Sequence, residues 1–176
     1  MQDGVGGVFP RPEAALERFS TAVSAIDGVR EVRDGTSEKR AFAAYDVTAT
    51  VVLADDAAPV EQTAVVRAVS AAADDAGGNG VRVSAVVVAG TLSFGVTADS
   101  VLSTQRLDVA RTVAEIGGVV AVRCSTGAER TAEDPALQRV EVVTGGTGAA
   151  LDAVVATASE RAHGVFPEAT VVSSPN

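Results

Sequence analysis

Two stretches of the chain carry apolar residues at the three- and four-residue spacing of an amphipathic helix. They are Leu16, Phe19, Val23 and Ile26 in the first stretch, and Val109, Val113 and Ile116 in the second. Pro12 precedes the first stretch, and its fixed φ suits the first turn of a helix. The pattern therefore predicts two helices, each with one face toward a core.

A glycine and two spaced valines follow each predicted helix. Gly28 can adopt the left-handed conformation that stops a helix, and Gly118 stands at the same place in the second stretch. The valines after each glycine predict a strand that begins directly after the turn. Polar segments at 34–40 and 125–134 then separate this strand from the next one.

The remaining apolar runs predict the same order of elements in both halves of the chain. Alternation predicts second strands at 45–53 and 137–143, and helical spacing predicts second helices at 59–75 and 149–162. Closing strands are expected at 81–88 and 169–173, and a leading strand of the second half at 92–97. A matching strand at 5–9 would be short or absent because of Gly6, Gly7 and Pro10.

An internal repeat agrees with this order. The segment 26–33, which begins Ile-Asp-Gly-Val, recurs as 116–123, which begins Ile-Gly-Gly-Val. At nearly the same offset, the Ala-Val-Val of 64–66 recurs at 153–155. We therefore predict two α/β repeats, at 1–90 and 91–176, related by duplication.

Strands that alternate with helices in this way are typical of split βαβ units, in which two helices cover one face of an antiparallel sheet. The sequence therefore predicts the α+β class, with two tandem ferredoxin-like plaits whose antiparallel sheets are each covered by two helices.

Charge and composition narrow the possible partners. The 176-residue chain has a formal net charge of −9 and Lys39 is its only lysine, whereas nucleic-acid binders gather Lys and Arg on one face. No apolar run reaches the roughly 18 to 20 residues of a membrane span. We therefore expect a protein partner or self-association, with no nucleic acid and no direct membrane span.

The strongest candidate for a ligand site is a glycine-rich turn made of Thr144, Gly145, Gly146, Thr147 and Gly148. It follows a predicted strand and precedes a predicted helix, where backbone N–H groups can cradle a phosphate. The turn resembles the start of a short-chain dehydrogenase fingerprint, but that family's next glycine is Ala149 here, and the chain that follows is too short for a dinucleotide fold. Two interpretations stay open, a plain β-to-α turn and a small-anion site.

Other reactive side chains are isolated along the sequence. Cys124 is the only cysteine, which excludes an internal disulfide and a zinc site built from several thiolates. His163 is the only histidine, and no pattern pairs it with Cys124. The acidic pairs at 55/56, 74/75 and 133/134 fall in turns or at helix ends, where solvated charge is typical. We therefore predict no catalytic residue, no metal site and no cofactor.

The plan of a helix followed by Gly-Val-x-x-Val looks like that of heavy-metal-associated domains and of the small-molecule-sensing plaits of amino-acid metabolism. Heavy-metal-associated domains carry Cys-x-x-Cys before the first helix. The corresponding segments here, 11–14 and 104–107, read Arg-Pro-Glu-Ala and Thr-Gln-Arg-Leu. Metal delivery is therefore not expected.

One repeat also resembles the alkaline shock protein family. The Val-Val-Leu of 51–53, the amphipathic stretch 60–73 and the Val-Arg-Val of 81–83 follow that family's outline of a Val-rich strand, a helix and a closing strand. The resemblance implies a non-catalytic protein that works near the cell envelope through self-association.

We therefore expect a non-enzymatic interaction or scaffold module whose sheet edges or faces bind another protein or a second copy of the chain. The resemblance favours the cell envelope over the cytoplasm, with an export segment or anchor removed upstream of Met1. The alternative is a small-molecule or anion sensor, with its site at the turn from Gly145 to Gly148 or between the repeats.

Overall fold

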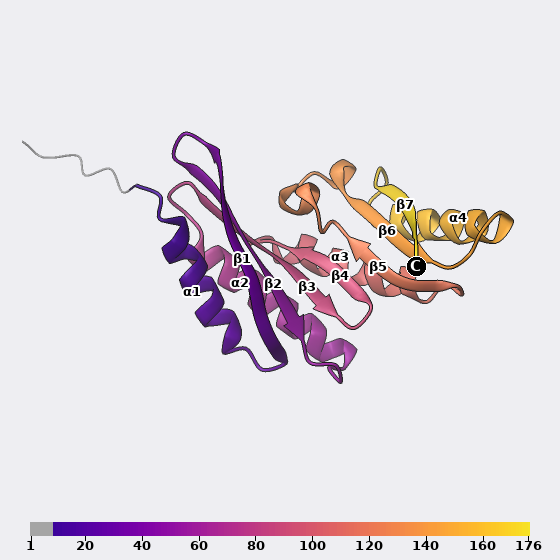
Figure 1. Ribbon diagram of the computed structural model, residues 1–176, viewed down its shortest axis with the longest axis horizontal. Helices are drawn as coiled ribbons and strands as arrows, with labels where there is room; N and C mark the ends of the chain where they lie inside the picture. Colours follow the sequence, from indigo (N-terminus) through magenta and orange to yellow (C-terminus); the bar gives the residue numbers. More distant parts are fainter. Residues whose placement is uncertain (1–8) are drawn as a thin grey trace, which may run out of the picture.

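A computed structural model describes residues 9–176, which form four α-helices and one seven-stranded sheet (Figure 1). The elements follow one another as α1 (Pro12–Ser24), β1 (Val29–Ala41), β2 (Ala44–Leu53), α2 (Pro59–Ala76), β3 (Val81–Ala89), β4 (Leu92–Val96), α3 (Ser100–Ala114), β5 (Val119–Cys124), β6 (Arg139–Thr144), α4 (Ala149–His163) and β7 (Thr170–Pro175). Two short 3-10 helices, η1 (Ala128–Thr131) and η2 (Pro135–Leu137), lie between β5 and β6.

The seven strands lie side by side in the order in which they occur along the chain. Hairpins join β1 to β2, β3 to β4 and β5 to β6, and these pairs are antiparallel. The other three pairs are parallel, and α2, α3 and α4 make their connections. A parallel pair needs a crossover of this kind because the chain must return to the end from which it started.

The four helices form one layer beside the sheet. Each packs against the next, α1 on α2, α2 on α3 and α3 on α4. In Figure 1, α2 and α3 lie behind the twisted strands, and α1 and α4 lie at the two ends of the helical layer. Crossovers between parallel strands share one handedness, which brings their helices to the same side.

The α+β class is confirmed, but the tandem ferredoxin-like plait is not. We expected two antiparallel sheets, and the structure has one mixed sheet. A split βαβ unit leaves room for another strand between the two strands that its helix joins. Here each helix returns the chain to the adjacent position, and the two-residue turn at Gly90 and Thr91 pairs β4 directly with β3. This turn joins the two halves into a single sheet.

The predicted glycine turns are confirmed. Gly28 has a φ of 89° and Gly118 a φ of 91°, in the left-handed region that favours glycine. The helices before them end slightly earlier, at Ser24 and Ala114. Both halves therefore enter their first long hairpin through the same type of turn.

The polar connection expected at 34–40 is wrong, because this segment belongs to β1. Pairing with β2 continues through Ser37 and Val47 to Ala41 and Ala44. β1 borders the sheet, so it needs few apolar residues, and charged side chains are common on such strands. The second polar segment, 125–134, separates β5 from β6 as expected. Of the strand considered at 5–9, positions 5–8 lie outside the described residues, and Phe9 precedes α1 without strand structure.

Apolar side chains from both halves form one continuous core between the helices and the sheet. Phe19 of α1, Phe94 of β4 and Phe166, which follows α4, are at most 1% exposed. Both halves contain a helix, two strands, a helix and a strand in the same order, which a duplication predicts, and in the second half β4 precedes this series. The predicted boundary between residues 90 and 91 lies within the turn of a paired hairpin, so the halves share both sheet and core.

Candidate interaction surface on the sheet

The face of the sheet opposite the helices presents a row of side chains that runs across all seven strands. Successive cross-strand pairs join Glu31, Val52, Val88, Ser93, Arg123, Glu141 and Val172. Side chains alternate between the two faces of a strand, so the core-facing neighbours of these residues, such as Val51 and Val87, are fully buried. We call the surface that this row crosses the open face.

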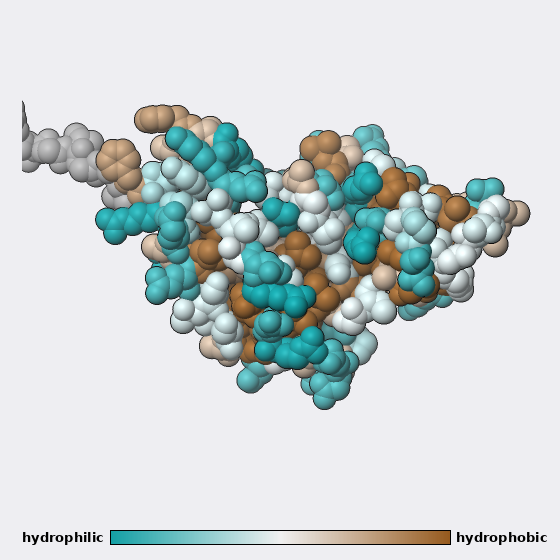
Figure 2. All heavy atoms as spheres, in the orientation of Figure 1, coloured by the Kyte–Doolittle hydropathy of each residue, from teal (hydrophilic) through white to brown (hydrophobic). Residues whose placement is uncertain are grey.

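Valines make up the middle of the open face. Val86 and Val88 of β3 are half-buried, although neighbouring Val87 on the core side is 0% exposed. Val52 and Val143 lie on the same face and are 4% and 6% exposed. Figure 2 shows brown apolar atoms that reach the surface between teal polar ones in the middle of the molecule. The open face therefore offers partly covered apolar area that a partner can bury.

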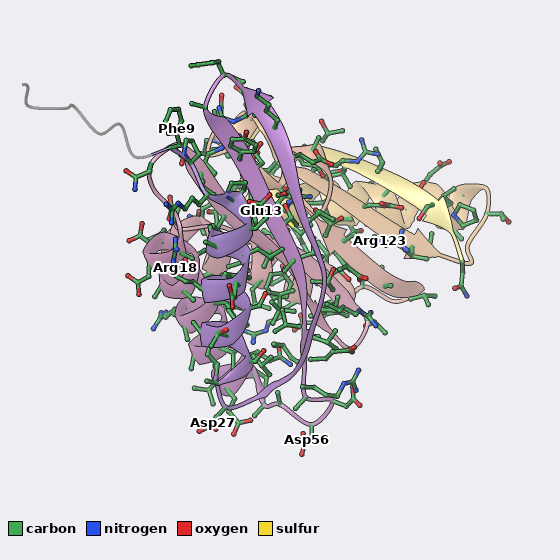
Figure 3. The ribbon with its side chains drawn as sticks, turned by 60° about the vertical axis from the view of Figure 1, so that its left-hand side comes forward. Phe9, Glu13, Arg18, Asp27, Asp56 and Arg123 are labelled. Carbon is green, nitrogen blue, oxygen red and sulfur yellow. The ribbon has the colours of Figure 1, made fainter. Side chains whose placement is uncertain are left out.

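Ion pairs flank these valines on both sides. On β5 and β6, Arg123 Nη1 lies 2.9 Å from Glu141 Oε1, and Figure 3 labels Arg123 in this half of the sheet. On β2 and β3, Arg82 donates to Asp46 through Nε at 2.9 Å and Nη2 at 3.0 Å. These hydrogen bonds hold the pKa of the Asp46 carboxyl below its usual value. Both charge signs are therefore held in place at the margins of the apolar area.

The segment between β5 and β6 reaches onto the open face at β2 and β3. Arg130 of η1 donates from Nε to Ser84 Oγ at 3.1 Å and from Nη2 to Thr48 Oγ1 at 2.9 Å. Ser84 is 1% exposed as a result. The segment covers one end of the open face and leaves Val86 and Val88 beyond it partly exposed.

Arg106 of α3 anchors this segment through hydrogen bonds from its guanidinium. Its guanidinium is fully buried and donates to the carbonyl oxygens of Gly95, Arg130 and Ala132 and to Gln138 Oε1, at 2.8 to 3.1 Å. All of these acceptors are neutral, and burial lowers the pKa of Arg106 to about 10. A buried cation held by neutral oxygens ties α3, β4 and the 125–138 segment into one unit.

Sequence reasoning missed Arg106, although a signal was present. Leu102, Val109 and Val113 are buried at helical spacing around it, so the same periodicity places position 106 on the core side of α3. A charged residue at such a position indicates a buried network of acceptors.

The glycine-rich turn forms as predicted between β6 and α4. Thr144 Oγ1 donates to Gly118 O at 2.8 Å and accepts from Gly146 N at 3.1 Å. A hollow of about 350 Å³ borders the turn. Its lining consists of Thr144, Gly145, Gly146, Thr147, Leu151, Ser173, Ser174, Pro175 and Asn176, with no charged side chain among them. One backbone donor is thus already occupied, and the ligand role of this turn stays a prediction.

The structure does not bring the isolated reactive groups together. Cys124 is buried in the core, and burial raises the pKa of its thiol to about 12. His163 ends α4, and its Nε2 lies 3.0 Å from Ala169 O. The acidic pairs lie in turns or at a helix end, as expected. Within residues 9–176, no three His, Cys, Asp or Glu side chains gather in a way that could hold a metal ion.

Comparison with protein-family models, with curated proteins and with solved structures finds no match to this chain. Among the helices of the described residues, none has both the length and the apolar character needed to cross a membrane.

Proposed function

We propose that this chain is a non-enzymatic interaction module that takes a protein partner on the open face. The observation that carries the proposal is the position of Val86 and Val88, which are half-buried in the middle of a sheet face. Covering apolar area gains about 25 cal/mol per Å². A partner that covers these valines gains this free energy without any change in the helical layer.

The breadth of the open face favours a protein as the partner. Seven adjacent strands at about 4.8 Å spacing span roughly 30 Å. This width suits a protein interface of standard size, which buries about 800 Å² on each partner. Arg123, Glu141 and Arg130 supply charges of both signs around the apolar middle, which is typical of the polar rim of an interface.

The resemblance of one repeat to the alkaline shock protein family supports the non-catalytic part of the proposal. The location near the cell envelope that the resemblance implies belongs to the same proposal. Fractionation of cells that produce the full-length protein tests it. Recovery with the envelope fraction is expected, and recovery in the cytoplasmic fraction alone would contradict the envelope location.

A photoreactive side chain at Val88 tests the open face directly. The matched control carries the same side chain at Val101, an apolar residue on α3 that is 66% exposed on the helical side. In cells, Val88 is expected to give a discrete protein adduct that Val101 does not give. The substitution Val86→Lys is expected to reduce this adduct about tenfold, since it places a charge in the apolar middle. Equal labelling at both positions, or no adduct at Val88, would refute the proposal.

A further inference from the structure

β7 forms one border of the sheet and pairs only with β6 among the described strands. Figure 3 shows it along the outer margin of the second half. Thr170 N donates to Gln138 O at 2.9 Å, so position 170 bonds toward β6. In a parallel pair the bonding residues alternate, which directs the backbone groups of Val171 and Ser173 outward. These groups are available to a further strand.

The two borders of the sheet differ in how they meet such a strand. β1 carries Arg30, Glu31, Arg33, Glu38, Lys39 and Arg40, and its register with β2 shifts three times. Charges and irregular register are the usual protection of border strands. β7 reads Thr-Val-Val-Ser-Ser-Pro, has no charged residue and pairs with β6 without a shift. The protection present on β1 is therefore missing from β7.

We propose that two copies of this chain pair through antiparallel β7 strands, around a twofold axis at Val172. With this register, Val171 of one copy faces Ser173 of the other, and each such pair exchanges two backbone hydrogen bonds. Four bonds result, and the ladder ends at Pro175, which has no N–H. The two sheets join into one of twice the width.

Among the possible approaches of a second copy, the charge of the protein favours an approach along β7. With a net charge of −9, two copies repel one another over most approaches. β7 is a stretch of surface without charge, where like charges do not meet directly. At the axis, Val172 meets Val172 of the second copy as a close, non-hydrogen-bonded pair, which adds apolar contact.

A buried hydroxyl provides a second, independent observation. Ser174 Oγ is buried and has no hydrogen-bond partner among the described residues. In the proposed register, Ser174 lies opposite Thr170 of the second copy, and Ser–Thr pairs at such positions form hydrogen bonds. Thr170 of the second copy would thus supply a partner that the described residues of one chain do not supply.

Light scattering coupled to size-exclusion chromatography tests the proposal on the full chain, from about 1 µM to about 500 µM. A dimer is expected at the upper concentrations. Val172→Lys and Ser173→Pro are each expected to raise the dissociation constant at least tenfold, because one places like charges opposite each other and the other removes an outward N–H. Ser173→Ala keeps that N–H and is the matched control. A monomer throughout, or a dimer unaffected by either substitution, would overturn the proposal.

Cross-linking tests the register without relying on a destabilising variant. In a Cys124→Ser background, Val172→Cys places two thiols directly opposite each other at the axis, and mild oxidation is expected to yield a disulfide-linked dimer. Thr170→Cys faces Ser174 instead and is expected to stay monomeric on a reducing-agent-free gel. Linkage of both variants to the same extent, or of Thr170→Cys alone, would contradict this register. Of the open-face row, this pairing uses only Val172 at the border of the sheet and leaves Val86 and Val88 uncovered, so this proposal and the proposed function can fail separately.

Discussion

Replacing Arg106 by methionine is expected to release the 125–138 segment from the sheet. Methionine fills much of the same space but donates no hydrogen bond. Four neutral oxygens, on Gly95, Arg130, Ala132 and Gln138, then each lose one hydrogen bond. At about 1 kcal/mol for each bond, the loss is about 4 kcal/mol. Methionine also removes the cost of burying a cation, which returns part of this free energy, so we expect a net loss of about 2 to 3 kcal/mol.

Urea unfolding of Arg106→Met measures this loss, and amide hydrogen exchange shows where it acts. Exchange is expected to accelerate in residues 125–138 before it does so in α1 or β2, because the segment opens locally. Arg67→Met is the control, since Arg67 is exposed on α2 and its side chain makes no hydrogen bond or ion pair to the rest of residues 9–176. A loss below about 0.5 kcal/mol with unchanged exchange would show that Arg106 does not hold the segment.

Three further predictions concern Cys124, Asp46 and the two glycine turns. Because burial raises the pKa of Cys124 to about 12, folding favours its thiol form. That contribution to stability is complete below pH 9 and falls as the pH rises toward 12. We expect a disulfide reagent at pH 8 to label Cys124 of the native protein only as fast as the protein opens, and to label the urea-unfolded chain at once. The pKa of Asp46 is lowered, so its stabilising effect is present above its unfolded pKa and lost as the pH falls through the folded one. Asp46→Asn is therefore expected to flatten the decline of stability as the pH falls below about 4, and an unchanged acid titration monitored by circular dichroism would contradict this. Gly28→Ala and Gly118→Ala are each expected to cost about 1 to 2 kcal/mol from positive φ. Gly28→Ala is expected to cost more, because its new Cβ would lie 3.0 Å from Val65 Cγ2, whereas the Cβ of Gly118→Ala would have its nearest neighbour at 3.7 Å. Equal urea midpoints for the two variants would refute this difference.

Local patterns were sufficient to predict most elements of this fold. The helical spacing of Phe19 and Val23, the glycine turn at Gly28 and the alternation in β2 each reflect interactions within a few residues. The start of β1 was predicted after Gly28, but its continuation through 34–40 escaped this reasoning, because its border position removes the need for apolar alternation. A polar segment there has the same composition as a loop, and only its pairing with β2 distinguishes the two.

The order of the strands and the surface they create depend on contacts that the sequence pattern does not encode. Whether β4 pairs with β3 or begins a separate sheet is decided by the tight turn at Gly90 and by the shared core. The strand order determines which face of the sheet the helical layer covers, and the open face is the one that it leaves uncovered. Val86 and Val87 look alike in the sequence, yet one faces the open side and the other the core. Arg106 was missed for a related reason, because its acceptors come from segments distant in the chain.

The sequential order of the strands gives this protein a direction of assembly. Each strand pairs with the one synthesised just before it, so α1, β1, β2, α2 and β3 can form a packed unit before the second half leaves the ribosome. Later strands then add one at a time to the existing border, with short loop closures at each step. Among the described strands β7 adds last, and its outer side is the border to which a further strand would add. Where a second copy meets that border, assembly between chains continues the same growth that builds each one.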